Sequence, residues 1–126
     1  MTPTIPIDPK NVETFAETLI GHLNGAALVL MTSLGHRTGL FDTMASMDAG
    51  TSDEIAVQAK LDERYVREWL NAMTTGGIVE HDPMSTRYRL PPEHAAMLTR
   101  RATPNNLAVV AQFIPVLAQV EDGIVD

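Results

Sequence analysis

Histidine is the side chain best suited to acid–base chemistry and metal binding near neutral pH. The chain carries four, at His22, His36, His81 and His94. His22 and His36 fall in one predicted helix at a separation of ~21 Å, so they cannot share a metal ion. A ligand role for His22 would need a partner from another chain or domain. His36 lies near the predicted helix C-terminus, where a charged imidazole interacts well with the helix dipole. We interpret all four histidines as structural.

Two pairs of adjacent carboxylates, Asp53–Glu54 and Asp62–Glu63, are the next candidates. Each pair lies in the first turn of a predicted helix, where capping and the helix dipole favour acids. A general acid–base pair needs a pocket, and nothing in the sequence indicates one. We interpret both pairs as helix-start residues. Gly76–Gly77 precedes a predicted strand, so it ends a helix and presents no helix N-terminus to a phosphate.

Several chemistries are excluded by what the sequence lacks. It has no cysteine, which removes disulfides, thiolate catalysis and cysteine-ligated zinc. It contains no G-x-G-x-x-G, no P-loop, no H-E-x-x-H and no G-x-S-x-G. We therefore expect no catalytic, cofactor-binding or metal-ligating residue in this chain.

Composition and charge indicate an acidic globular protein. The chain has 126 residues, of which 44% are hydrophobic, enough for one domain with its own core. Nine basic against 16 acidic residues give a net charge of −7, which argues against a phosphate-binding surface. The first residues lack the features of a secretory signal. No uncharged apolar run reaches the ~18 residues of a membrane span, and residues 23–34 come closest. We expect a cytoplasmic protein.

Two helices are predicted to flank the centre of the chain. Residues 1–10 carry three prolines and are predicted to be a flexible arm. A helix over 11–37 follows, with small residues at 21, 25, 26 and 27 that allow another helix to approach closely, and Gly39 ends it. A last helix over 105–120 has two apolar faces, and Pro115 is expected to kink it. The first helix carries apolar residues at intervals of three and four: Val12, Phe15, Leu19, Leu23, Ala26, Leu30 and Leu34.

The centre of the chain has the signals of a winged helix. Residues 51–54 form a capping box, Asp62 is a second N-cap, and Gly76–Gly77 ends the second helix. Strands at 78–81 and 87–90 surround a turn, and a short helix follows at 93–99. The predicted fold is mainly α: a winged helix-turn-helix with a small β-hairpin, flanked by a long N-terminal helix and a C-terminal helix. The predicted division is 1–10 arm, 11–50 dimerisation helices, 51–99 winged helix and 100–126 C-terminal helix.

A DNA-binding winged helix inserts the second helix of its motif into the major groove. Here that helix starts with Asp62–Glu63, which places negative charge where phosphates would lie. Arg87 and Arg89 are the basic residues available on the wing. The outward positions of the second helix mix both charges: Glu63, Arg64, Arg67, Glu68 and Asn71.

The order and spacing of several short segments resemble the N-terminal winged-helix domain of class I S-adenosylmethionine-dependent methyltransferases. The closest likeness is to the bacterial group, with kinship to small-molecule O-methyltransferases. The resemblance covers about residues 11–120. It rests on residues 33–42, Thr51–Ala56, Asp62–Leu70, 76–80 and 88–91.

The resemblance implies a module that forms a dimer and whose helices cover a substrate pocket. In that family a following Rossmann-like domain binds S-adenosylmethionine, and the catalytic residues also lie there. That domain is absent from the present sequence, so no cofactor residue is carried over, and the chain alone is expected to be inactive.

The apolar pattern independently predicts a partner, because the two flanking helices carry more hydrophobic surface than so small a domain covers. A homodimer through helices 11–37 and 105–120 is the simplest closed arrangement. Two alternatives remain: a DNA-binding transcription regulator, and a small-molecule sensor with a cavity between the first helix and the kinked last one.

Overall fold

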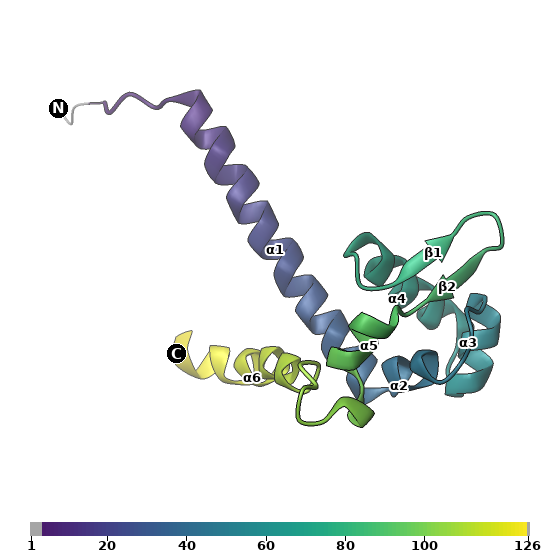
Figure 1. Ribbon diagram of the computed structural model, residues 1–126. Helices are drawn as coiled ribbons and strands as arrows, with labels where there is room; N and C mark the ends of the chain where they lie inside the picture. The colour runs from purple at the N-terminus through teal and green to yellow at the C-terminus, as the bar shows by residue number, and fades with distance from the viewer. Residues whose placement is uncertain (1–3, 126) are drawn as a thin grey trace.

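Helix α1, Pro9–Arg37, is the longest element and projects from the rest of the chain (Figure 1). The structure is a computed structural model that describes residues 4–125. Asp8 caps α1 by accepting a hydrogen bond from the backbone N–H of Lys10, at 2.9 Å. The helix therefore begins two residues before the predicted start, since Pro9 fits the first turn. Residues 1–3 of the predicted arm lie outside the described residues.

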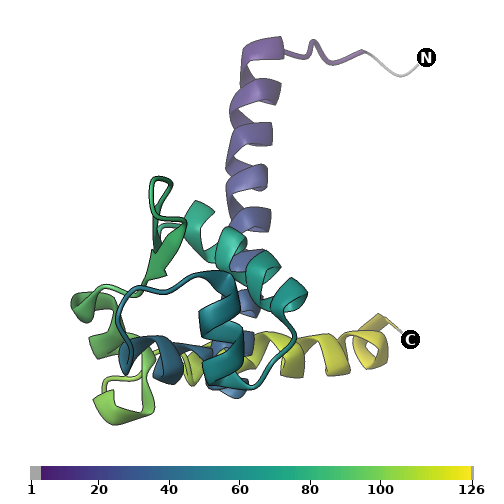
Figure 2. The same cartoon turned by 90° about the vertical axis from the view of Figure 1, so that its right-hand side faces the viewer.

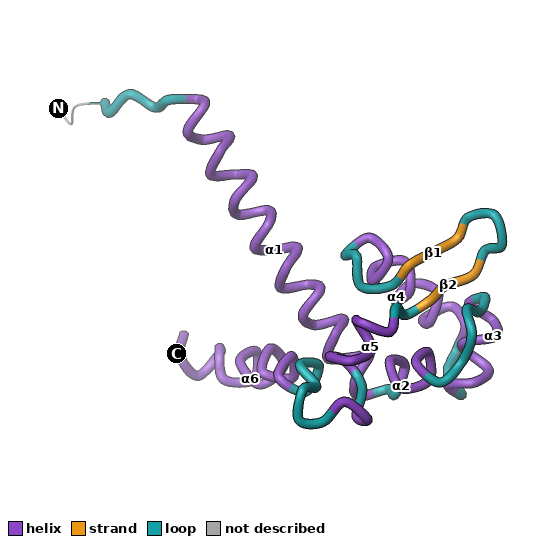
Figure 3. The backbone as a smooth tube through the Cα atoms, viewed as in Figure 1, coloured by secondary structure: helices purple, strands orange, loops and turns teal. Residues whose placement is uncertain are grey.

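The central elements confirm the predicted winged helix-turn-helix with its flanking helices. Gly39 has a φ of 79° and separates α1 from α2, as predicted. The two strands pair antiparallel, with His81 opposite Tyr88 (Figure 3). The elements are α2 (Leu40–Ala45), α3 (Ser52–Ala59), α4 (Glu63–Thr75), β1 (Glu80–Asp82), β2 (Arg87–Arg89) and α5 (Pro92–Leu98).

The helix starts form largely as predicted. Oγ1 of Thr51 accepts from the backbone N–H of Glu54 at 3.2 Å, and Asp62 accepts from that of Arg64 at 2.9 Å. The Glu54 carboxylate, however, pairs with Nη1 of Arg87 at 3.2 Å, so it holds the hairpin instead of completing the capping box. An ion pair across elements thus replaces a local contact that the sequence pattern favours.

The core forms where α1 ends on the winged helix. Phe41 packs edge-on against Trp69, with ring centroids 5.3 Å apart. Nε1 of Trp69 donates to the backbone carbonyl of Met31 at 2.8 Å, which ties α4 to the last third of α1. Gly35 permits this approach, because a Cβ there would lie 2.5 Å from Phe41 and 2.6 Å from Trp69. The largest fully buried side chains are Phe41, Ile55, Leu70, Met73 and Val66.

The end of the chain differs from its prediction. The helix starts at Phe113 and not at 105: α6 spans Phe113–Val125, after the 3₁₀ helices η1 (Arg100–Ala102) and η2 (Val110–Gln112). Asn106 accepts a hydrogen bond from the backbone N–H of Ala108 at 2.9 Å, the same contact by which Asp8 and Asp62 cap α1 and α4, but the chain that follows forms a turn and η2 before α6 begins. The kink that we predicted at Pro115 assumed a helix over 105–120, whereas Pro115 is the third residue of α6 and follows shortly after η2. Asp126 lies outside the described residues.

Helices α1 and α6 leave the body in different directions (Figure 2). Among the described residues, α1 is the one helix long and apolar enough, by length and composition, to cross a membrane. No Asp, Glu, Lys or Arg occurs between Glu17 and Arg37, and the polar His22 and Asn24 interrupt the apolar run. The expectation that no segment reaches span length therefore does not hold for α1 by this measure.

Gly35→Ala should destabilise the fold by about 1–3 kcal/mol, because the added methyl group must displace the Phe41 and Trp69 rings. Gly21→Ala on the same helix is the matched control, since no atom lies within 4 Å of the added Cβ. Gly21→Ala should stabilise the folded protein by about 0.5–1 kcal/mol, because alanine has a higher helix propensity than glycine. Urea unfolding at fixed protein concentration measures both changes. Equal effects of the two substitutions would contradict the close contact at Gly35.

Candidate functional site

The four histidines lie apart. His22 is exposed on the projecting part of α1, whereas His36 is half-buried near its end. His81 lies over the ring of Tyr88, with centroids 4.4 Å apart, and Nδ1 of His94 contacts the carbonyl of Ile78 at 2.7 Å. Within residues 4–125, no three His, Asp or Glu side chains are arranged to hold a metal ion.

The carboxylate pairs lie on the first turns of α3 and α4, as predicted. Glu63 accepts a hydrogen bond from Ser52 at 2.5 Å, which links the two helices of the helix-turn-helix. Glu54 holds Arg87, as described above, and Asp62 caps α4. Three of these four acids thus have identified structural contacts.

The outward face of α4, which a DNA-binding relative would use, is internally paired. Arg64 pairs with Glu68 at 3.6 Å and Arg67 with Glu63 at 3.9 Å, each one turn away on the same helix. The amide oxygen of Asn71 accepts a hydrogen bond from the Tyr88 hydroxyl at 2.9 Å. The groups that would contact bases or phosphates are engaged within the domain.

The hairpin shows the same pattern. Arg89 pairs with Glu80 across the two strands at 2.9 Å, and Arg87 pairs with Glu54. The turn carries Asp82, whose carboxylate accepts from the hydroxyl of Ser85 at 2.9 Å and from the backbone N–H of Met84 at 3.0 Å. These hydrogen bonds, that from Ser85 foremost, lower the pKa of Asp82. The wing turn therefore carries a fixed negative charge.

A cluster around Arg100 was missed by the sequence reasoning. The backbone N–H of Arg100 donates to Asp42 at 2.9 Å, and its guanidinium pairs with the same carboxylate. A second guanidinium nitrogen donates to the carbonyl of His36 at 2.8 Å. These contacts join η1 to α1 and α2 over sequence separations of 58 and 64 residues, so no local pattern reveals them.

Burial and the Arg100 cluster both affect the protonation of the His36 side chain. Burial, and then the positive charge of Arg100, lower the pKa of His36, while Asp42 acts in the opposite direction. Nδ1 of His36 is buried and has no hydrogen-bond partner among the described residues. The neutral imidazole is therefore favoured, although a charged side chain at this position would interact well with the helix dipole.

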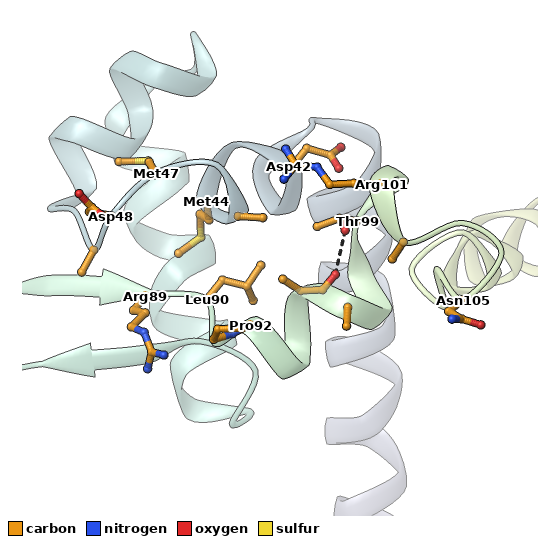
Figure 4. Close-up of a pocket in the computed structure, with 15 residues that line it drawn as sticks. Asp42, Met44, Met47, Asp48, Arg89, Leu90, Pro92, Thr99, Arg101 and Asn105 are labelled. Atoms are coloured by element: carbon orange, nitrogen blue, oxygen red, sulfur yellow. Dashed lines mark hydrogen bonds between the residues drawn. The ribbon is translucent and has the colours of Figure 1, made fainter.

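A groove of about 630 Å³ lies between α2, α5 and η1 (Figure 4). Met44, Met47 and Leu90 line it together with alanines, and Asp48, Arg89 and Arg101 contribute charged groups. Its volume suits a small molecule. The small-molecule sensor considered as an alternative would use a cavity between the first helix and a kinked last helix. The present groove instead lies between α2, α5 and η1.

The main unsatisfied feature is apolar surface on α1. All residues from 9 to 27 are exposed, so the described chain leaves that part of the helix largely uncovered. One face of α1, the α1 stripe, consists of Val12, Phe15, Leu19, Leu23, Leu30 and Leu34. Leu23 is the most exposed of these, at 62%. Gly21 and Gly25 face open space.

A second such face lies on α6. Its residues recur at intervals of three and four, and each is roughly half exposed or more. We call this face the α6 stripe: Phe113, Val116, Leu117, Val120 and Ile124. Exposed apolar faces of this extent mark interaction surfaces.

Comparison with known families identifies the domain. Residues 26–100 match the family model of the Rv2258c-like winged HTH domain, and the chain belongs to this family. No match was found among curated proteins.

Three solved structures share the fold. PigF, solved with SAH, has a TM-score of 0.69 at 17% identity over 94% of this chain and 33% of its own. The mitomycin 7-O-methyltransferase MmcR has a TM-score of 0.69 and 19% sequence identity, and the match covers 84% of this chain and 30% of MmcR. Human N-acetylserotonin methyltransferase, in complex with SAM, has a TM-score of 0.67 and 13% identity, and the match covers 90% of this chain and 32% of the human protein. The chain thus spans about a third of the length of each of these three proteins.

Protonation of His36 should destabilise the protein below its ordinary pKa of 6.5. The folded state holds the imidazole neutral and the unfolded state binds the proton, so stability falls as the pH drops through this range. Urea midpoints measured at about pH 7.5 and about pH 5.5 test this. His36→Gln should lose less stability over that interval than the wild type. His22→Gln, an exposed control, should behave as the wild type does. An equal loss in His36→Gln would contradict the assignment.

Proposed function

We propose that this chain is the dimerisation and substrate-lid module of an S-adenosylmethionine-dependent methyltransferase acting on a small molecule. The observation that carries the proposal is the pair of uncovered apolar stripes on α1 and α6, which flank the winged helix. The fold shared with about one third of MmcR and of human N-acetylserotonin methyltransferase, and of PigF, which was solved with SAH, supports the same function. A separate domain would bind the methyl donor and perform the transfer.

The parts of the chain take different roles in this proposal. Residues 11–50 supply the dimerisation helices, residues 51–99 form the winged helix, and residues 100–126 lead towards the catalytic domain. The protein works in the cytoplasm as a homodimer. The second dimerisation segment, predicted as a helix over 105–120, consists of η2 and α6, since the helix starts at Phe113.

Burying the two stripes against a second copy of the chain is favourable in free energy. Full burial of a large apolar side chain contributes ~1.5–3 kcal/mol, so burying the remaining half of one contributes ~1 kcal/mol. Six side chains on α1 and five on α6, in each of two copies, sum to roughly 20 kcal/mol. Association costs ~4–15 kcal/mol. The balance favours a dimer, and an isolated helix as bare as the first half of α1 is only marginally stable in water.

A DNA-binding regulator is the second candidate, because the helix-turn-helix places Arg64 and Arg67 on the outward face of α4. The ion pairs on that face and the net charge of −7 argue against it. Surface ion pairs are weak, at about 0–1 kcal/mol, so the arginines are not locked. The charge balance of the domain is therefore the stronger objection.

Leu23→Asp should weaken the dimer more than tenfold, because it places a carboxylate in the middle of the α1 stripe. Asn24→Asp is the matched control: it adds the same group on the same helix, turned by about 100°. Both positions are exposed, so neither change disturbs the core. Sedimentation or light scattering over a concentration series measures the dimer. A monomeric wild type at tens of micromolar, or equal effects of the two variants, would contradict the proposal.

The DNA-binding alternative predicts a salt-dependent mobility shift with duplex DNA. We expect no shift even at about 50 mM salt, where phosphate contacts are strongest. Glu63→Gln combined with Glu68→Gln frees both arginines of α4 and serves as the sensitised control. Binding by the wild type that weakens steeply with added salt would favour the regulator.

A further inference from the structure

The α1 stripe also indicates how the second copy is placed. We propose that the two copies pair their α1 helices antiparallel, stripe against stripe, with the two Leu23 side chains meeting at the two-fold axis. This inference rests on the proposed homodimer and adds its orientation and register. The partner surface is therefore the α1 stripe of a second copy of this chain.

The first support is the spacing of the stripe around Leu23. Val12 and Leu34 lie equally far from it in sequence, so a symmetric antiparallel pair brings them opposite each other. In a two-fold interface, a residue at the axis meets its own copy. When Leu23 lies at the axis, the stripes of the two copies therefore overlap along their whole length.

The second support is the match of large and small side chains at that register. Leu30 faces Ala16, and Leu19 faces Ala27. Alternation of large and small residues lets two helices pack closely and interdigitate. A register shifted by a few residues loses this alternation.

The third support is the distribution of charge along α1. Asp8 lies at its start and Arg37 at its end, whereas Lys10, Glu13 and Glu17 lie about 80–140° away from Leu23 around the helix. Arg37 forms no ion pair within residues 4–125. The antiparallel register brings Arg37 of one copy beside Asp8 of the other. A parallel pair would instead place Asp8 beside Asp8 and Arg37 beside Arg37, and such contacts select orientation more than affinity.

The shape of the chain leaves room for this arrangement. Helix α1 has 29 residues and is about 43 Å long, at 1.5 Å per residue. The winged-helix bodies of the two copies then lie near opposite ends of the helix pair. In both views of the ribbon the first half of α1 stands clear of the other elements (Figures 1 and 2).

The chain has no cysteine, so single-cysteine variants report contacts without a background. Under mild oxidation, Leu23→Cys should form a disulfide-linked dimer at least about tenfold faster than Asn24→Cys, because the axis raises the effective thiol concentration. Val12→Cys alone and Leu34→Cys alone should remain largely uncrosslinked. A mixture of these two variants should form the mixed dimer.

The outcomes separate this inference from the proposed function. If the reduced variants sediment as dimers but Val12→Cys links to its own copy, the helices are parallel and the inference is overturned. If dimers persist and neither Leu23→Cys nor the mixture crosslinks, another surface holds the copies together and the inference again fails. If the reduced variants and the wild type are monomers, the proposed dimerisation itself fails. Association with vesicles of neutral lipid by a monomeric wild type would assign the stripe to a membrane.

Discussion

The close contact that Gly35 permits between α1 and the Phe41–Trp69 pair determines the shape of the molecule. It fixes the last third of α1 against α2 and α4, with the Trp69–Met31 hydrogen bond as a second tie. Because the anchor lies near the end of the helix, the first two thirds project beyond the winged helix. The apolar stripe along this projection is then left uncovered by the chain's own residues. The apolar stripe is therefore exposed because the core contacts only the last third of α1.

The winged helix serves a structural purpose in this arrangement. Two side chains that a DNA-binding member could direct at DNA, Arg87 and Asn71, hold neighbouring elements together here, whereas Arg64 and Arg67 pair within α4. Arg87 connects the hairpin to α3, and Asn71 connects α4 to the hairpin through Tyr88. Individually these contacts contribute little, since the ion pairs are exposed. Together they join the hairpin to α3 and to α4.

Local signals in the sequence were sufficient for the elements and insufficient for their connections. The helix start at Thr51, the left-handed Gly39 and the alternation around Tyr88 each depend on neighbouring residues, and each was predicted. The Arg100 cluster joins residues some 60 positions apart, and no periodicity encodes such a contact. Pro115 illustrates the intermediate case: its effect on the helix depends on where the helix begins, and α6 begins at Phe113, two residues before it. The candidate surface was foreseen on α1, because a stripe is a periodic feature, and was only partly foreseen on α6.

The central claim is that a second copy covers the first half of α1. Hydrogen exchange of the backbone amides in residues 12–26, measured over a range of protein concentrations, tests it most directly. These residues are all exposed in the described chain, so their helix should open readily in a monomer. The account predicts that their exchange slows as concentration rises, while exchange in the core around Trp69 changes far less. Fast exchange of residues 12–26 at every concentration would contradict it.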